Sequence, residues 1–149
     1  MHVSETGFEK AALIDAPPGW RWQTRVRFQD IDAAGIVFYP RILEYFHDAY
    51  VELLSVRGVA LDAALRDRRW LAPIKHAEAD FLAPLSFGDV VDVELVRALV
   101  AGSVLTLGWR ASAGGRAVAV GHTVHVFVDA RFQKVPVPEA VAAAFASMA

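Results

Sequence analysis

The residues whose types and spacing are best suited to chemistry are two carboxylates in a short loop, Asp30-Ile31-Asp32-Ala33-Ala34-Gly35. This loop lies between a segment with strand periodicity and a helix whose first turn suits Pro40. Asp is favoured in loops and near helix N-termini, so a structural role explains both carboxylates from spacing alone. The chemical alternative is that an ionised carboxylate beside free helix N–H groups supplies a base or nucleophile, together with donors for a developing oxyanion.

The five histidines are weaker candidates for catalysis or metal binding. His122 and His125 lie three apart in a predicted strand, where alternating side chains point to opposite faces, so we do not expect them to bind one metal ion. His76 also lies in a predicted strand and is interpreted as a packed or surface residue. His47 neighbours Asp48 in a predicted long helix and could contact a cleft there. These spacings predict no metal site.

The composition argues against several other classes of chemistry. The chain has 149 residues, of which 55% are hydrophobic and 21% are charged, as expected for one globular domain with its own core. Fifteen basic and seventeen acidic residues give a formal net charge of −2 without a basic run, which argues against a nucleic-acid surface. The absence of cysteine excludes thiol nucleophiles and Cys-rich metal centres. Phosphate-binding glycine loops and the Gly-x-Ser-x-Gly motif are also absent.

The first nineteen residues differ in character from the rest of the chain. They end in Pro17-Pro18-Gly19, which breaks regular structure, so residues 1–19 are predicted to be a flexible N-terminal arm and residues 20–149 a single domain. The arm lacks the charged-then-apolar layout of a signal peptide. The longest nearly apolar stretch, residues 98–109, is too short to span a bilayer. We therefore expect a cytoplasmic protein that has no membrane partner.

The elements that must position the two carboxylates follow from hydrophobic periodicity. Apolar residues at three- and four-residue steps between Leu43 and Leu54 predict a long amphipathic helix that begins near Pro40 and ends at Gly58. A short helix over residues 61–68 follows, then four strands over residues 74–81, 90–100, 103–112 and 116–129, and a terminal helix over residues 139–149. Strict alternation over residues 20–28 predicts a first strand, whose core-facing set is Trp20, Trp22, Thr24, Val26 and Phe28.

This order of elements predicts an α+β architecture. Strands joined by short turns pair antiparallel, and one amphipathic helix is enough to cover one face of their sheet. We therefore expect a five-stranded antiparallel β-sheet wrapped around a long central α-helix. The other face of the sheet still carries apolar residues, which predicts a homo-oligomer that covers this face or extends the sheet.

The segment from Phe28 to Arg41 also carries a family resemblance. Its sequence, Phe28-Gln29-Asp30-Ile31-Asp32-Ala33-Ala34-Gly35-Ile36-Val37-Phe38-Tyr39-Pro40-Arg41, closely resembles the signature of the hotdog-fold acyl-CoA thioesterases of the 4-hydroxybenzoyl-CoA thioesterase family, in the branch whose catalytic Asp precedes the central helix. The resemblance continues through residues 43–49, 79–81 and 84–89 and ends near residues 126–138. It implies a hotdog fold and an acyl-CoA thioesterase that acts on an aromatic, 4-hydroxybenzoyl-CoA-like substrate or on a short-to-medium-chain acyl-CoA.

The resemblance assigns roles to individual residues of the loop. It implies that Asp32 is the catalytic carboxylate, either as nucleophile or as general base for a water, and that the backbone N–H of Tyr39 polarises the thioester carbonyl. Gly35 permits the turn and a close backbone approach, whereas Asp30 holds the loop. Substrate contacts are implied for Ile36, Val37, His47 and Asp48.

The binding of coenzyme A is harder to assign. Family members for aromatic CoA esters can carry a basic cluster before the fourth strand, but here residues 97–103 hold a single Arg. Ser103, Arg110, Arg131 and Lys134 are the remaining candidates for CoA contacts. No separate cofactor is expected, because coenzyme A is part of the substrate.

The family also implies an assembly and leaves two alternatives open. Its members share active sites between the subunits of a dimer, and dimers commonly pair as tetramers. The sparse basic cluster keeps open a hydrolase that acts on acyl groups carried by acyl carrier protein. The second alternative is a non-catalytic hotdog module that binds an acyl ligand without releasing a thiol.

Overall fold

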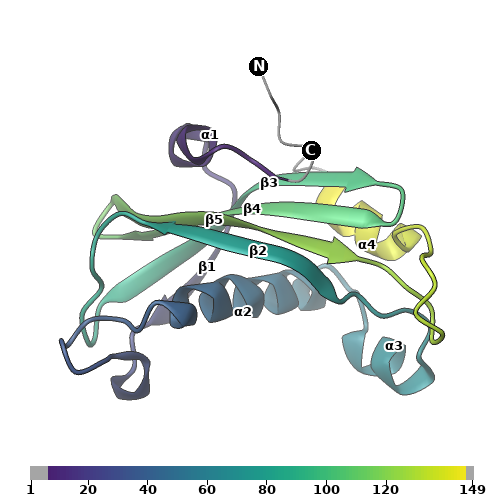
Figure 1. The fold of residues 1–149 in the computed structure, drawn as a ribbon, viewed down its shortest axis with the longest axis horizontal. Coiled ribbons are helices and arrows are strands. Elements are labelled where there is room, and N and C mark those ends of the chain that lie inside the picture. Colours follow the sequence, from purple (N-terminus) through teal and green to yellow (C-terminus); the bar gives the residue numbers. More distant parts are fainter. Residues whose placement is uncertain (1–6, 147–149) are drawn as a thin grey trace.

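The computed structural model describes residues 7–146 and contains one five-stranded antiparallel sheet with strand order β1-β3-β4-β5-β2. The long helix α2 (Pro40–Val56) runs along one face of this sheet (Figure 1). The expected α+β architecture, with an antiparallel sheet wrapped on a central helix, is therefore confirmed. The strands are β1 (Trp20–Arg25), β2 (Ile74–Phe81), β3 (Val90–Ala101), β4 (Val104–Ala113) and β5 (Arg116–Val126).

Helix α2 is held against the sheet by its apolar stripe. Phe46 is fully buried and stacks on Trp109 of β4, with ring centroids 5.9 Å apart. Each large apolar side chain buried in this way contributes about 1.5–3 kcal/mol. The helix ends before Gly58, whose φ of +80° is a left-handed conformation that glycine adopts without strain. The buried stripe consists of Ile42, Tyr45, Phe46, Ala49, Tyr50, Leu53 and Leu54.

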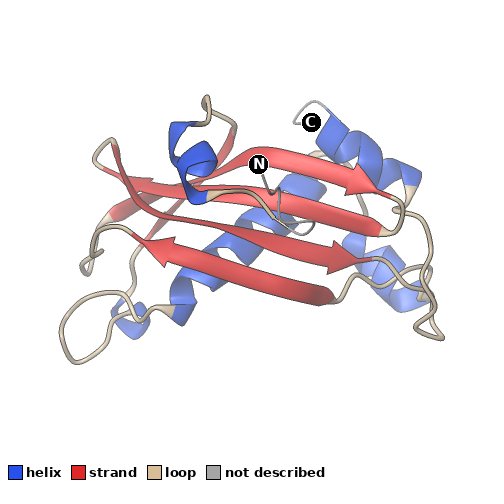
Figure 2. Ribbon diagram, turned by 45° about the horizontal axis from the view of Figure 1, so that its top comes forward, coloured by secondary structure: helices blue, strands red, loops and turns tan. Residues whose placement is uncertain are grey.

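The segment before the first strand is packed rather than loose. A short helix, α1 (Lys10–Asp15), lies on the face of the sheet opposite α2 (Figure 2). Leu13 is only 1% exposed and packs with Val96 and Val120 of the sheet. Pro17-Pro18-Gly19 ends this helix but does not detach it, so residues 7–19 are not the flexible arm that the sequence predicts. Residues 1–6 lie outside the described residues.

The structure differs from the sequence prediction at the end of the first strand and in the placement of Phe28. The first strand ends at Arg25, because residues Phe28–Asp30 turn into a 3₁₀-helix, and Phe28 is 75% exposed instead of facing the core. The terminal helix α4 (Glu139–Phe145) packs against α2 and β3 and closes one end of the core. The remaining short helix is α3 (Leu61–Asp67). Within residues 7–146, no helix is both long and apolar enough to cross a membrane.

Candidate active site

Asp32 lies at the start of a tight turn that precedes α2. Its backbone N–H donates to the carbonyl of Ile36 (2.9 Å), and the Gly35 N–H donates to the carbonyl of Asp32 (3.0 Å). Gly35 has a φ of +80°, so the turn needs a residue that tolerates the left-handed region. The Ala34 N–H donates to Asp32 Oδ1 (2.8 Å), which orients the side chain. Among the described residues, Asp32 Oδ2 has no protein donor.

Asp30 anchors the same loop from inside the protein. Its fully buried carboxylate accepts hydrogen bonds from the Arg27 backbone N–H (2.9 Å), from two Arg27 guanidinium nitrogens (3.1 and 3.2 Å) and from the Tyr45 hydroxyl (2.8 Å). Burial raises the pKa of Asp30, but these hydrogen bonds outweigh it and place the pKa below its ordinary value. Burial and the contact with Asp30 raise the pKa of Tyr45. The structural role expected for Asp30 is confirmed.

The N-terminus of α2 presents a free backbone donor beside Asp32. The N–H of Val37 donates to the Leu85 carbonyl and that of Phe38 to the Asp30 carbonyl, both at 2.8 Å. Pro40 has no N–H. The Tyr39 N–H has no acceptor within residues 7–146, so it is the first donor that the helix leaves available, at the positive end of its dipole.

Asp32 and Tyr39 line the same cavity, which has a volume of about 620 Å³. This lies within the roughly 300–1,000 Å³ that is typical of small-molecule sites. Apart from Asp32, its walls are formed by apolar residues and Tyr39, and both Asp32 and Tyr39 are exposed in the single chain. The other lining residues are Ile36, Val37, Ile42, Phe81, Leu82, Ala83, Pro84, Leu85 and Val118.

Only part of this lining could be foreseen from sequence. Ile36 and Val37, both expected substrate contacts, line the cavity. The segment from Leu82 to Leu85 was not expected there, because nothing local indicates that the turn after β2 folds back over the start of α2. The Val37 N–H bond to Leu85 and the bridge between Ile36 and Ser86 produce this contact.

His47 and Asp48 lie elsewhere in the single chain. Both are exposed on α2 and line a second hollow of about 530 Å³, together with Arg27, Arg41 and Ile74. They do not line the cavity of Asp32.

The structure contradicts the prediction that Arg110 contacts CoA. Its guanidinium is buried, pairs with Glu94 (Nη2 to Oε2, 3.1 Å) and donates to the carbonyls of Ile14 (3.0 Å) and Ala16 (2.7 Å). These bonds fasten α1 to the outer face of the sheet. Because the cation is already satisfied inside the protein, it is not available to a CoA phosphate.

The other CoA candidates lie near the opposite end of α2 from Asp32. Ser103 belongs to the turn between β3 and β4, where its carbonyl accepts the Phe127 N–H (2.8 Å). Arg131 and Lys134 are exposed in the segment that follows β5. The β3–β4 turn and this segment lie at the end where α2 finishes (Figure 1). The single chain therefore does not bring these three residues to the cavity.

The two histidines of β5 point to opposite faces, as predicted. The His125 ring lies against Tyr50 of α2, with centroids 4.6 Å apart. On the outer face, His122 Nδ1 lies 2.9 Å from Glu78 Oε1, and the His76 ring stacks on that of His122. This outer cluster lies across the sheet from α2 and separate from the cavity of Asp32.

Comparisons with known proteins agree with this arrangement. Residues 26–145 match the family described as Thioesterase-like superfamily. The chain is 31% identical over 122 residues to a 1,4-dihydroxy-2-naphthoyl-CoA hydrolase of Synechococcus elongatus, covering 80% of this chain and 90% of the relative. The structure of a 1,4-dihydroxy-2-naphthoyl-CoA thioesterase from Synechocystis superposes with a TM-score of 0.81 at 26% identity, covering 87% of this chain and 96% of that one.

A gentisyl-coenzyme A thioesterase provides a further structural match, with a TM-score of 0.76 at 30% identity over 82% of this chain and 98% of that one. The family match spans most of the chain, and the sheet wrapped on α2 is common to the matched structures. The chain therefore belongs to the thioesterase-like superfamily, as a thioester hydrolase with the hotdog fold.

Proposed function

We propose that the chain hydrolyses aromatic acyl-CoA thioesters to the free acid and coenzyme A. The observation that carries this proposal is the placement of the Asp32 carboxylate and the free Tyr39 N–H on one apolar cavity of about 620 Å³. The activities of the relatives support the aromatic acyl group, since dihydroxynaphthoyl-CoA and gentisyl-CoA both carry an aromatic ring.

The mechanism follows from these two groups. The thioester carbonyl oxygen accepts a hydrogen bond from the Tyr39 N–H, whose helix dipole stabilises the oxyanion as the carbonyl carbon becomes tetrahedral. Asp32 either attacks this carbon through its free Oδ2 or removes a proton from an attacking water. A new carbon–oxygen bond forms, the carbon–sulfur bond breaks, and the leaving thiolate takes up a proton. On the direct route, water then hydrolyses the mixed anhydride.

We further propose that two chains form the working unit by pairing their β2 strands. β2 is an edge strand, so one side of its backbone is open to pairing. Several apolar side chains around the cavity are exposed in the single chain, Ile36, Tyr39 and Phe81 among them. A second copy that covers them removes an apolar patch from water. Pairing of two such dimers gives the expected tetramer.

This dimer also accounts for the scattered CoA candidates. Antiparallel pairing of two β2 strands turns the second chain by half a turn, so its far end lies beside the cavity of the first. Arg131 and Lys134 of that far end then approach the mouth of the cavity, where the phosphates of coenzyme A emerge. Ser103 lies at the same end, but in the β3–β4 turn, which β5 separates from β2.

The test is thiol release from a panel of CoA esters: benzoyl, 4-hydroxybenzoyl, gentisyl, dihydroxynaphthoyl, phenylacetyl and straight acyl chains of increasing length. The proposal predicts the largest kcat/KM on one of the aromatic esters. A larger kcat/KM on straight chains would contradict the aromatic assignment. The same acyl group presented on acyl carrier protein tests the carrier, and saturable binding of every ester without thiol release would indicate a binding module instead.

A further inference from the structure

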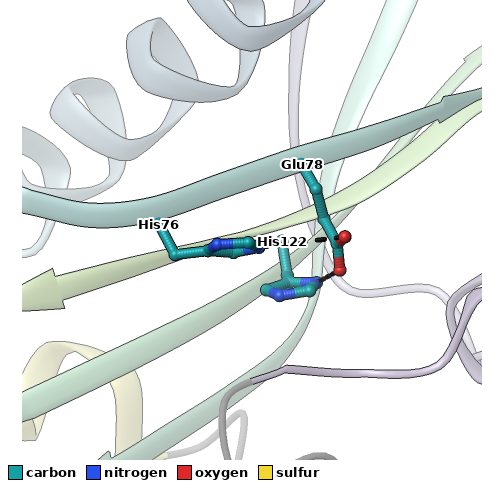
Figure 3. A group of neighbouring side chains, drawn as sticks. All are labelled: His76, Glu78 and His122. Atoms are coloured by element: carbon teal, nitrogen blue, oxygen red, sulfur yellow. Dashed lines mark ion pairs between the residues drawn. The ribbon is translucent and has the colours of Figure 1, made fainter.

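A second cluster of chemically capable side chains lies on the outer face of the sheet, opposite α2. His76 and Glu78 project from β2 and His122 from β5, and the three side chains converge (Figure 3). Their potential ligand atoms all lie within 4.8 Å of one another. The cluster takes no part in the proposed thioester hydrolysis, so its function has to be sought separately.

The strand pairing explains why these three residues meet. His76 and Glu78 are two residues apart on β2, so their side chains share one face of the sheet. Glu78 is the direct cross-strand partner of His122 in the β2–β5 pairing, and His76 lies diagonally from it. Residues at i and i+2 of one strand, with a third opposite on the next, form a tripod that the backbone holds in register.

The distances within the tripod suit a small metal ion. His122 Nδ1 lies 2.9 Å from Glu78 Oε1, and His76 Nε2 lies 3.8 Å from Glu78 Oε2. Two ligand atoms bound to one tetrahedral Zn²⁺ at about 2.0–2.2 Å are roughly 3.3–3.6 Å apart. The first separation is shorter and the second longer than this range, and they involve different oxygens of Glu78. The side chains of His76 and Glu78 are about half exposed, so both have room to rotate toward a shared ion.

His122 is the fixed member of the tripod. It is buried, and the backbone of Gly7 passes so close to its ring that a Cβ on Gly7 would overlap the imidazole. The ring is therefore packed against Gly7, and its Nδ1 lies 2.9 Å from Glu78 Oε1.

The surroundings leave room for a fourth ligand and favour a cation. A hollow of about 250 Å³ adjoins His122 and Glu78 and is open enough to admit water. The charged groups that line it are the carboxylates of Glu9, Glu78 and Asp80 and the ammonium of Lys10. Three carboxylates against one ammonium give the hollow a negative formal charge.

We propose that His76, Glu78 and His122 bind one divalent transition-metal ion, Zn²⁺ foremost, with water in the fourth position. Two imidazoles and one carboxylate match the ligand set of open zinc sites, whereas Mg²⁺ and Ca²⁺ prefer oxygen ligands throughout. The ion ties the edge strand β2 to β5. This site departs from the expectation of no metal site, which considered the histidines without the cross-strand register.

The site is compatible with the proposed dimer. Pairing of β2 edges uses backbone groups in the plane of the sheet, and the three ligands project from its outer face. The proposed metal site and the proposed thioesterase site therefore lie on different faces of the sheet, so an experiment can refute one proposal without refuting the other.

The test is titration of the untagged full chain, freed of metal with a chelator, with ZnCl₂ in a calorimeter. We expect one Zn²⁺ per chain and an affinity at least about tenfold lower in His76→Ala and in Glu78→Gln. Both side chains are exposed enough to be changed without disturbing the core. Glu52→Gln is the matched control, because it makes the same change at an exposed glutamate of α2, on the opposite face of the sheet from the tripod, and its affinity is expected to stay within twofold of the wild type.

Co²⁺ provides a second readout of the same site. The visible absorption of bound Co²⁺ is expected to have the intensity of four-coordinate ligation in the wild type and in Glu52→Gln, and to be lost in His76→Ala. The proposal is overturned if Zn²⁺ does not bind in a one-to-one ratio, or if His76→Ala and Glu78→Gln bind it as tightly as Glu52→Gln does.

Discussion

The hydrogen bond from Tyr45 to Asp30 is expected to be a measurable part of the protein's stability. Tyr45→Phe keeps the ring in the core but removes the hydroxyl that donates to Asp30 Oδ2 at 2.8 Å. A hydrogen bond to a charged group contributes about 1.5–3 kcal/mol, so we expect a loss of that size in the free energy of unfolding at pH 7. For a chain of this length the loss corresponds to a Tm lower by roughly 3–12 °C.

The same substitution has a defined pH dependence. The hydrogen bonds hold the pKa of Asp30 below its ordinary value, so the folded state binds this proton more weakly than the unfolded chain does. Stability from Asp30 is therefore fully present above the unfolded pKa of about 3.9 and is lost as pH falls through the folded pKa. The difference between wild type and Tyr45→Phe is expected to be constant near neutral pH and to shrink below about pH 4.

Tyr50→Phe is the matched control for this measurement. Tyr50 is also a buried tyrosine of α2, but among the described residues its hydroxyl has no hydrogen-bond partner, and burial raises its pKa to about 12. Urea unfolding of the three proteins from pH 7 to pH 3 compares them directly. If Tyr45→Phe and Tyr50→Phe lose equal stability, or if the loss in Tyr45→Phe does not fall with pH, the anchoring role of Asp30 is refuted.

Two further predictions concern the segment that packs on the outer face. Leu13→Ala is expected to reduce the free energy of unfolding by about 2–5 kcal/mol, because Leu13 is 1% exposed in a packed cluster. Urea unfolding measures this change, and a loss below about 0.5 kcal/mol would restore the flexible-arm interpretation. Arg110→Met is expected to cost about 3–5 kcal/mol, because it leaves the Glu94 carboxylate buried without its partner, while KM for an acyl-CoA ester stays unchanged. A clear rise in KM with little loss of stability would return Arg110 to the CoA site.

The sequence predicts local elements well where one period dominates. The alternation after Trp20 and the three- and four-residue spacing of α2 led to the correct types of element, and Gly58 marked the end of the helix. Phe28 was misplaced because the Arg27–Asp30 hydrogen bonds turn the chain out of the strand, and side-chain bonds of this kind override alternation. The packing of residues 7–19 was missed because one helical turn with a single buried leucine has too short a pattern to be recognised.

The residues of the candidate site likewise differ in whether the sequence alone can group them. Asp32, Gly35 and Tyr39 lie in one continuous segment, so the family signature alone is enough to group them. Long-range partners cannot be read in this way: the register that sets Glu78 opposite His122 depends on how two distant strands pair. The carbonyls that occupy Arg110 likewise come from a segment more than ninety residues away.

The central claim is that the carboxylate of Asp32 carries the chemistry, and Asp32→Asn tests it most directly. The side chain is exposed, so the substitution is expected to leave the free energy of unfolding within about 0.5 kcal/mol of wild type. On the best ester of the panel, kcat for thiol release is predicted to fall by roughly 10²- to 10⁴-fold, which is about 2.7–5.4 kcal/mol of activation free energy. A folded Asp32→Asn variant that releases thiol at the wild-type rate would contradict the account.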